Sequence, residues 1–248
     1  MRCIFLGTNG WFDTQTGNTI CTLIETQRCF IILDAGNGIH KIDSYVYHPQ
    51  KPVYLFLSHF HLDHIIGLHT LSKFTSLRAI EIYGPLGARH WLNLIINYPF
   101  TVPLRDLPFD VTVNELHEGP HNLPFSVECR RLLHPSACYG YRFTLDGKTV
   151  AYCPDTGVCE NAVELAKNAD LLVIECSLKS GEKNPKWPHL NPEDAIAIAR
   201  EASAKKLALV HFDANIYASL SDRLEIESKF SQGYAELFVT TDDMVINL

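Results

Sequence analysis

The segment Ser58-His59-Phe60-His61-Leu62-Asp63-His64 constrains the fold of this chain more than any other feature of the sequence. It places four side chains of metal-binding types within six residues, directly after the apolar run 53–58. In an extended backbone His59 and His61 point to the same side, and a turn before a helix can bring Asp63 and His64 to face them. The pattern predicts a strand that ends in a metal-binding loop.

Three further apolar runs end in a residue that can bind a metal: ECRRLL in His134, TVAYCP in Asp155 and LALV in His211. Residues at strand ends converge on one rim of a sheet, so we expect these side chains to join the His59 motif. Histidine and aspartate without a thiolate favour Zn²⁺ or Mn²⁺, and Fe²⁺ is also compatible. Seven ligands are too many for one tetrahedral ion. They predict two divalent ions ~3.5 to 4 Å apart that share a carboxylate and a bridging hydroxide, the nucleophile.

Short apolar or alternating runs predict the β-strands, and helical periodicity predicts the helices between them. The predicted strands cover 1–6, 19–25, 28–34, 53–58, 79–83, 110–116, 125–133, 138–145, 149–153, 171–176, 207–212, 235–240 and 244–248. The predicted helices cover 64–74, 86–97, 159–169, 191–205 and 221–231, and the fourth opens with the capping sequence Asn191-Pro192.

Strands that come first in hairpin series and later alternate with helices favour two sheets packed face to face, with helices outside. This is a four-layer αββα sandwich of the α/β (α+β) class. No repeat, charge block or Ser/Gly linker divides the sequence, so we expect residues 1–248 to form a single domain. Prolines punctuate 99–124, which we expect to be an irregular surface insertion.

The composition limits the partners and the location of the protein. There are 28 acidic and 21 basic residues, and a net charge of −7 removes the general electrostatic support that most nucleic-acid binders have. No run approaches the ~18 apolar residues of a membrane span, and MRCIFLG does not resemble a secretory signal, so we expect a cytoplasmic protein without a membrane partner. The eight cysteines lack the spacing of a cysteine zinc site and are expected to be buried thiols.

The histidine motif 58–64 resembles that of the metallo-β-lactamase fold. It is preceded by Leu33-Asp34-Ala35-Gly36 and followed by the isolated His134, Asp155 and His211, as in that fold. The architecture of that fold is the αββα sandwich. Within the fold, the chain is similar to ribonuclease Z and its phosphodiesterase relatives from Gly7-Thr8 onwards. The matching segments are Pro154-Asp155-Thr156, Glu175-Cys176-Ser177-Leu178, His189-Leu190 and 207–212.

This resemblance implies a role for each residue of the site. His59, His61 and His134 would bind the first ion, Asp63, His64 and His211 the second, and Asp155 would bridge them. Asp63 and His189 would be the catalytic side chains.

The resemblance also implies that His189 binds the phosphate and protonates the leaving oxygen, a role that suits imidazole near neutral pH. Asp34 stands where the family has an aspartate that supports the metal-binding loop; a plain turn carboxylate is the alternative. Glu175 ends the buried run LLVIE, where an unpaired charge would be costly, so we expect it to support the site as well. A surface role for His189 remains the alternative to a catalytic one.

The chain departs from ribonuclease Z in one respect that bears on the substrate. Ribonuclease Z has a long basic arm for transfer RNA, whereas residues 84–124 contain only Arg89 and Arg105 as bases. We therefore expect a phosphodiesterase for a small or short phosphodiester, with RNA weakly supported. The alternatives are a transfer-RNA 3′-processing endonuclease, in which a homodimer supplies the missing contacts, an ester, thioester or lactam hydrolase, and a non-catalytic binding module.

Overall fold

The computed structural model describes residues 1–46, 50–230, 234 and 236–248. Two seven-stranded sheets form the centre of the molecule, and a two-stranded sheet lies beside them. The first sheet has the strand order β16 (Val245–Asn247), β1 (Arg2–Gly7), β3 (Cys21–Glu25), β4 (Phe30–Leu33), β5 (Val53–Phe56), β6 (Ala79–Pro85) and β7 (Asp110–Leu116). Strands β4 to β7 run parallel to one another.

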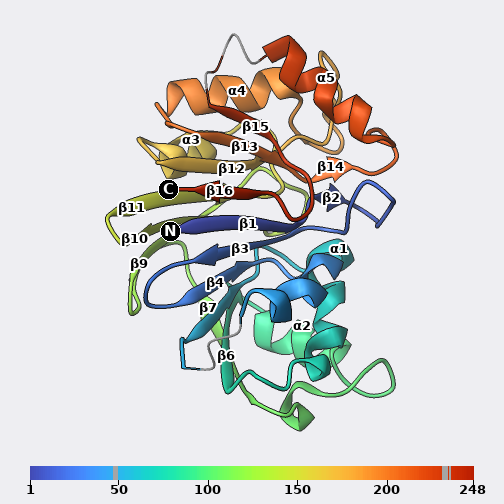
Figure 1. Cartoon of the computed structure of the whole chain (residues 1–248), viewed down its shortest axis with the longest axis vertical. Helices are drawn as coiled ribbons and strands as arrows, with labels where there is room; N and C mark the ends of the chain where they lie inside the picture. The colour runs from blue at the N-terminus through green and yellow to red at the C-terminus, as the bar shows by residue number, and fades with distance from the viewer. Residues whose placement is uncertain (47–49, 231–233, 235) are drawn as a thin grey trace.

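The second sheet has the strand order β15 (Leu237–Val239), β13 (Leu207–Val210), β12 (Leu171–Glu175), β11 (Lys148–Cys153), β10 (Tyr139–Leu145), β9 (Ser126–Arg131) and β8 (Gly119–Asn122). Strands β11, β12, β13 and β15 are parallel. The small sheet pairs β2 (Asn9–Gly10) with β14 (Phe212–Asp213), at the right of Figure 1. It joins the start of the chain to the segment that follows β13.

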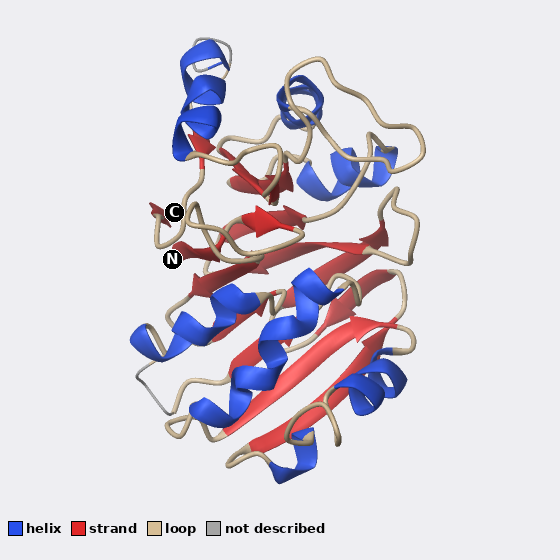
Figure 2. Cartoon of the chain, turned by 90° about the vertical axis from the view of Figure 1, so that its right-hand side faces the viewer, coloured by secondary structure: helices blue, strands red, loops and turns tan. Residues whose placement is uncertain are grey.

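Helices cover the outer face of each sheet. The α-helices are α1 (Leu62–Ile65), α2 (Ala88–Ile95), α3 (Glu160–Ala166), α4 (Pro192–Glu201) and α5 (Leu220–Phe230), and the 3₁₀ helices are η1 (Asn37–Ser44), η2 (Ile66–Lys73) and η3 (Leu104–Asp106). Helices α4 and α5 lie at the top of Figure 1, and α1 and α2 lie on the right-hand side of its lower half. Figure 2 shows the helices along the outside of the strands.

Three separate apolar clusters fill the spaces between the layers. The central cluster lies between the two sheets and includes Phe5, Phe56 and Tyr141. A second cluster joins the first sheet to η1, η2 and α2, and a third joins the second sheet to α3 and α4. Three cores between four layers are the packing of an αββα sandwich, so the predicted fold class is confirmed.

Every predicted strand has a counterpart, and the short strands β2, β8 and β14 were not predicted. Residues 231 and 235, at the ends of two predicted elements, lie outside the described residues. Asn191 caps α4 as predicted, because its side chain accepts a hydrogen bond from the backbone N–H of Asp194. The irregular insertion expected over 99–124 is confined to its first half. The second half forms the predicted strand 110–116, which is β7, and the additional strand β8, and it links the edges of the two sheets.

The predicted helix 64–74 is instead one turn of α-helix followed by 3₁₀ turns. Its backbone bonds to a neighbouring loop: Gly67 N–H donates to the carbonyl of Ala35, and Ala35 N–H donates to that of His64. A Cβ at Gly67 would lie 2.2 Å from the Gly36 oxygen, so this close approach requires glycine. The contact between the two loops therefore replaces regular helical bonding.

Among the described residues, no helix combines the length and hydropathy that crossing a membrane requires.

Candidate metal centre

The candidate ligands follow the carboxyl ends of strands in both sheets. His59 and His61 come after β5, with Asp63 and His64 on α1, while His134 follows β9, Asp155 follows β11 and His211 follows β13. The carboxyl ends of parallel strands lie at the same edge of a sheet. The structure thus brings all seven predicted ligands to one rim of the sandwich.

The first group consists of His59, His61, His134 and Asp155, whose donor atoms lie within 4.8 Å of one another. Asp155 Oδ2 is 3.5 Å from the Nε2 atoms of both His59 and His134. Donors ~2.1 Å from one tetrahedral ion would be ~3.4 Å apart. These distances match the spacing of ligands around a single ion.

The second group consists of Asp63, His64 and His211. The Nε2 atoms of His64 and His211 are 3.1 Å apart, and Asp63 Oδ2 lies 3.2 Å from the nitrogen of His211 and 3.7 Å from that of His64. Asp155 also faces this group, because its Oδ1 is 3.0 Å from His211 Nε2. One carboxylate therefore lies between two sets of donors, as in a bridged pair of ions.

Several donor atoms of the site are buried without a hydrogen-bond partner. They are Nε2 of His59, Nε2 of His134 and Oδ1 of Asp155, which is near His211 but not in hydrogen-bond geometry. Buried polar atoms are rarely left unpaired in proteins. Their convergence with the other donors fits a pair of divalent cations.

The two groups differ in their protonation without a metal. Burial lowers the pKa of His59 and His61, and it lowers the pKa of His134 to about 4. Burial also opposes the charged form of His64, but the carboxylates of Asp34, Asp63 and Asp155 outweigh it and raise that pKa to about 10. The first group thus offers neutral imidazoles, whereas a cation entering the second group must displace a proton.

Three of the candidate ligand histidines each have a serine hydroxyl next to their Nδ1 atom. Ser58 Oγ is 3.0 Å from His59 Nδ1, Ser136 Oγ is 3.1 Å from His134 Nδ1, and Ser177 Oγ is 3.1 Å from His211 Nδ1. A partner on Nδ1 fixes the ring and turns Nε2 towards the metal side. Sequence reasoning assigned no role to these serines.

Asp34 is fully buried beneath the site. It accepts hydrogen bonds from the Ser58 backbone N–H, from His64 Nδ1 and from the Tyr152 hydroxyl of the second sheet. Its φ of 56° is in the left-handed region, a strained conformation for a residue other than glycine. Asp34 therefore ties the histidine motif to both sheets and is not a solvated turn carboxylate.

His211 also has a left-handed backbone, with φ at 55°. Its ring packs so closely on Gly10 that a Cβ there would lie 2.6 to 2.9 Å from three ring atoms. The absence of a side chain at Gly10 in β2 is thus required for the position of this histidine.

His189 lies next to the site and donates a 2.7 Å hydrogen bond from Nδ1 to Glu175. Glu175 is buried and also accepts from the backbone N–H groups of Thr156, Ser177 and Leu190. Burial opposes the charged form of His189, but Glu175 outweighs it and raises the pKa to about 9. The pair is a histidinium held by a carboxylate beside the predicted ligands.

A cavity of about 440 Å³ opens over this rim. Its walls include His61, Asp63, Asp155, His189 and His211, together with Trp11 and Trp187. The eight cysteines stand apart from it as free thiols, and all but Cys159 are buried.

The Beta-lactamase superfamily domain model matches residues 30–212. The chain belongs to this family. A ribonuclease Z of Bacillus velezensis is 27% identical, over 92% of this chain and 94% of the relative. With its family and ligand set, the protein is a metal-dependent hydrolase of the ribonuclease Z-like branch.

Solved structures agree with the fold. The metallo-β-lactamase fold protein YhfI from Bacillus subtilis superposes with a TM-score of 0.80 at 23% identity, over 99% of this chain and 98% of that one. The short form of human tRNase Z gives a TM-score of 0.76 at 23% identity, over 100% and 99%. At this identity, the likeness supports the fold alone.

Proposed function

We propose that this protein is a phosphodiesterase with two divalent ions that hydrolyses a small or short phosphodiester, and that residues 1–248 act as a single hydrolase domain in the cytoplasm. The observation that carries the proposal is the position of Asp155 between two groups of donors, next to the His189–Glu175 pair. His59, His61 and His134 would hold the first ion and Asp63, His64 and His211 the second. The donors suit Zn²⁺ or Mn²⁺ best, with Fe²⁺ also compatible.

When bound, the ions would activate a water molecule as nucleophile and offset the negative charge on the phosphate oxygens. His189 supplies what the metals do not, a proton for the departing alkoxide. Its Nδ1 is bonded to Glu175, which leaves Nε2 for the substrate. Asp63 lines the same cavity and would orient the attacking water.

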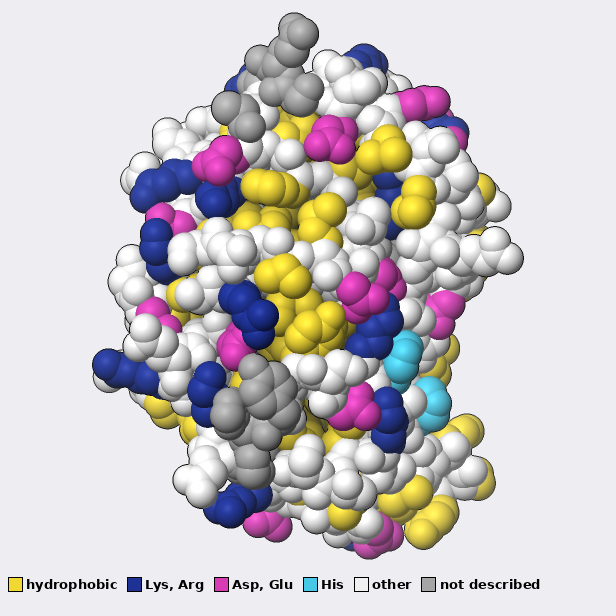
Figure 3. Space-filling view, viewed as in Figure 1, with side chains coloured by type: hydrophobic (Ala, Val, Ile, Leu, Met, Phe, Trp, Pro, Cys, Tyr) yellow, Lys and Arg dark blue, Asp and Glu magenta, His cyan; other side chains and the backbone are white. Residues whose placement is uncertain are grey.

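Two observations favour a small substrate over an extended RNA. The alignment with the Bacillus velezensis ribonuclease Z spans 292 positions, more than the 248 residues of this chain, so the relative contains segments that this chain lacks. On the face in Figure 3, the Lys and Arg side chains that are drawn alternate with Asp and Glu and form no continuous basic track. An RNA backbone needs such cations at physiological salt.

Transfer-RNA processing is the second candidate, because the curated relative is a ribonuclease Z. Lys179, Lys183 and Lys186 lie on the exposed loop that leads to His189, where a homodimer would combine two sets of bases. Hydrolysis of an ester, thioester or lactam is a third use of the same centre. It has no need of His189 as a phosphate-binding acid.

A substrate panel tests the proposal on protein loaded with Zn²⁺ or Mn²⁺. We expect hydrolysis of bis(4-nitrophenyl) phosphate and of short dinucleotides, with rates that change little between ~50 and ~200 mM salt. Specific cleavage of precursor transfer RNA at ~0.15 M salt would favour the second candidate. Turnover of thioesters or lactams without any diester would contradict the proposal.

A further inference from the structure

Two tryptophans line the cavity over the candidate metal centre, and the chemistry described above uses neither. Trp11 is 67% exposed and Trp187 is 46% exposed. Large exposed aromatic side chains beside a polar pocket are typical of binding surfaces. The third tryptophan, Trp91, is 44% exposed on α2, and it does not line this cavity.

Trp187 has a defined position. Its indole ring lies parallel to the ring of His61, with centroids 6.0 Å apart and an interplanar angle of 11°, and it meets His134 edge-on at 6.1 Å. Its backbone N–H donates to both the carbonyl and the side-chain oxygen of Asn184, which also lines the cavity. A planar surface thus stands directly beside two candidate ligands of the first ion.

Trp11 lies beside the second group of candidate ligands, Asp63, His64 and His211. Its backbone N–H donates a 2.8 Å hydrogen bond to Asp63 Oδ2. Its φ of 71° is in the left-handed region, which is strained for a tryptophan. The fold therefore maintains a strained residue with its indole exposed, next to the atoms that would bind metal.

The loop that carries Trp11 is built around Asn9. The Asn9 amide donates to the carbonyls of Phe12 and Gly17 and to Thr14 Oγ1. Its side-chain oxygen accepts from the buried guanidinium of Arg223. This network holds the backbone of the loop that carries Trp11 beside the cavity.

We propose that Trp187 and Trp11 bind a planar ring of the substrate, so that the preferred phosphodiester is one whose alcohol is a nucleoside. This inference rests on the proposed phosphodiesterase activity and adds the group that is recognised. Among biological phosphodiesters, nucleotides carry a planar aromatic group within reach of the phosphate. Every base has a π-face, so stacking on an indole accepts different bases.

Two esters with the same leaving group separate stacking from chemistry. Thymidine 5′-(4-nitrophenyl phosphate) and methyl 4-nitrophenyl phosphate both release 4-nitrophenolate, and only the first has a base. We expect the thymidine ester to have the higher kcat/KM, by about 5- to 150-fold. Trp187→Ala should remove most of this preference and change the methyl ester less than about twofold, while Trp187→Phe should retain most of it.

Trp11→Ala should reduce the preference in the same way, and Trp91→Ala is the matched control, which should alter neither ester. Equal losses on both esters in Trp187→Ala would show that the indole does not select the base and would overturn the proposal. So would a wild-type enzyme without preference for the thymidine ester. If neither ester is hydrolysed, the phosphodiesterase proposal itself fails.

Binding gives a readout that does not depend on turnover. In Trp91→Phe protein, the two remaining tryptophans are those of the cavity. Thymidine 5′-monophosphate should quench their fluorescence, whereas ribose 5-phosphate should not. Equal quenching by both compounds, or quenching by neither, would count against stacking.

Discussion

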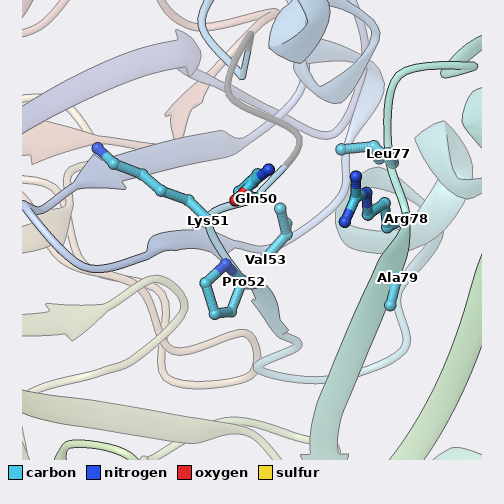
Figure 4. A pocket seen from close by; sticks show the side chains of 7 residues that line it. All are labelled: Gln50, Lys51, Pro52, Val53, Leu77, Arg78 and Ala79. Atoms are coloured by element: carbon cyan, nitrogen blue, oxygen red, sulfur yellow. The ribbon is translucent and has the colours of Figure 1, made fainter.

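The carboxyl ends and the amino ends of the parallel strands differ in the side chains that gather there. At the carboxyl ends, seven metal-type ligands lie together with His189 and two buried carboxylates, and a cavity opens over them. At the amino ends of β5 and β6, a cavity of about 210 Å³ is lined by Gln50, Lys51, Pro52, Val53, Leu77, Arg78 and Ala79 (Figure 4). A hollow exists at both ends, so a hollow alone does not indicate function.

The polar groups of the second cavity do not converge. Lys51 extends away from Arg78 in Figure 4, donates to the carbonyl of Thr26 and pairs with Glu25 at 3.8 Å. Gln50 and Arg78 are exposed to solvent. Ligands of open α/β sheets bind beyond the carboxyl ends of the strands, and the distribution of side chains here follows that rule. The comparison predicts that substitutions have large effects at one end and small effects at the other.

The largest effect is expected for Asp155→Ala, which removes the carboxylate between the two groups of donors. Diester hydrolysis should fall by at least ~10²-fold, as when a major electrostatic stabiliser of a transition state is lost. Arg78→Ala, at the opposite end, should leave kcat/KM within about twofold, since exposed sites rarely affect remote chemistry. Comparable losses in the two variants would remove the distinction between the ends.

A smaller and more selective loss is expected for His189→Ala. A general acid contributes most when the leaving group is a poor one. Activity should fall by ~10²-fold for a dialkyl ester and much less for a 4-nitrophenyl ester, with the metal content unchanged. Elemental analysis and kinetics on the two esters check this, and equal losses on both would point to phosphate binding without proton transfer.

The smallest effect is a shift in pH dependence in Glu175→Gln. His189 acts in its protonated form, so activity that depends on it is present below its pKa and is lost as the pH rises through it. Glu175 raises this pKa to about 9, and a neutral amide would raise it less. The alkaline limb of the pH–rate profile for a poor leaving group should therefore move to lower pH. A limb that stays in place would show that Glu175 does not control His189.

The sequence was sufficient to predict the strands other than β2, β8 and β14, and to predict the candidate ligands. Strands such as β5 and β12 are continuous apolar runs, because both faces of these strands are covered. The residue after such a run stands at a rim, so His211, which follows the buried run of β13, could be placed without a structure. The family match and the three cores bear out the predicted sandwich.

The environment of the ligands could not be predicted in the same way. The hydroxyl of Tyr152 reaches Asp34 across 118 positions of sequence, and Trp11 reaches Asp63 across 52. Such hydrogen-bond partners depend on how the two sheets are stacked, and a local sequence pattern contains no information on this stacking. The role of Ser177 was easier to predict than that of Tyr152, because Ser177 lies in the segment Glu175-Cys176-Ser177-Leu178, which was already identified from the sequence.

The number of bound ions tests the central claim most directly. The protein should be loaded with Zn²⁺ or Mn²⁺, freed of loose metal by gel filtration and measured by elemental analysis against protein concentration. Two ions per chain are predicted, because six ligands form two groups of three around the shared Asp155. At most one ion per chain after full loading would contradict the dinuclear site.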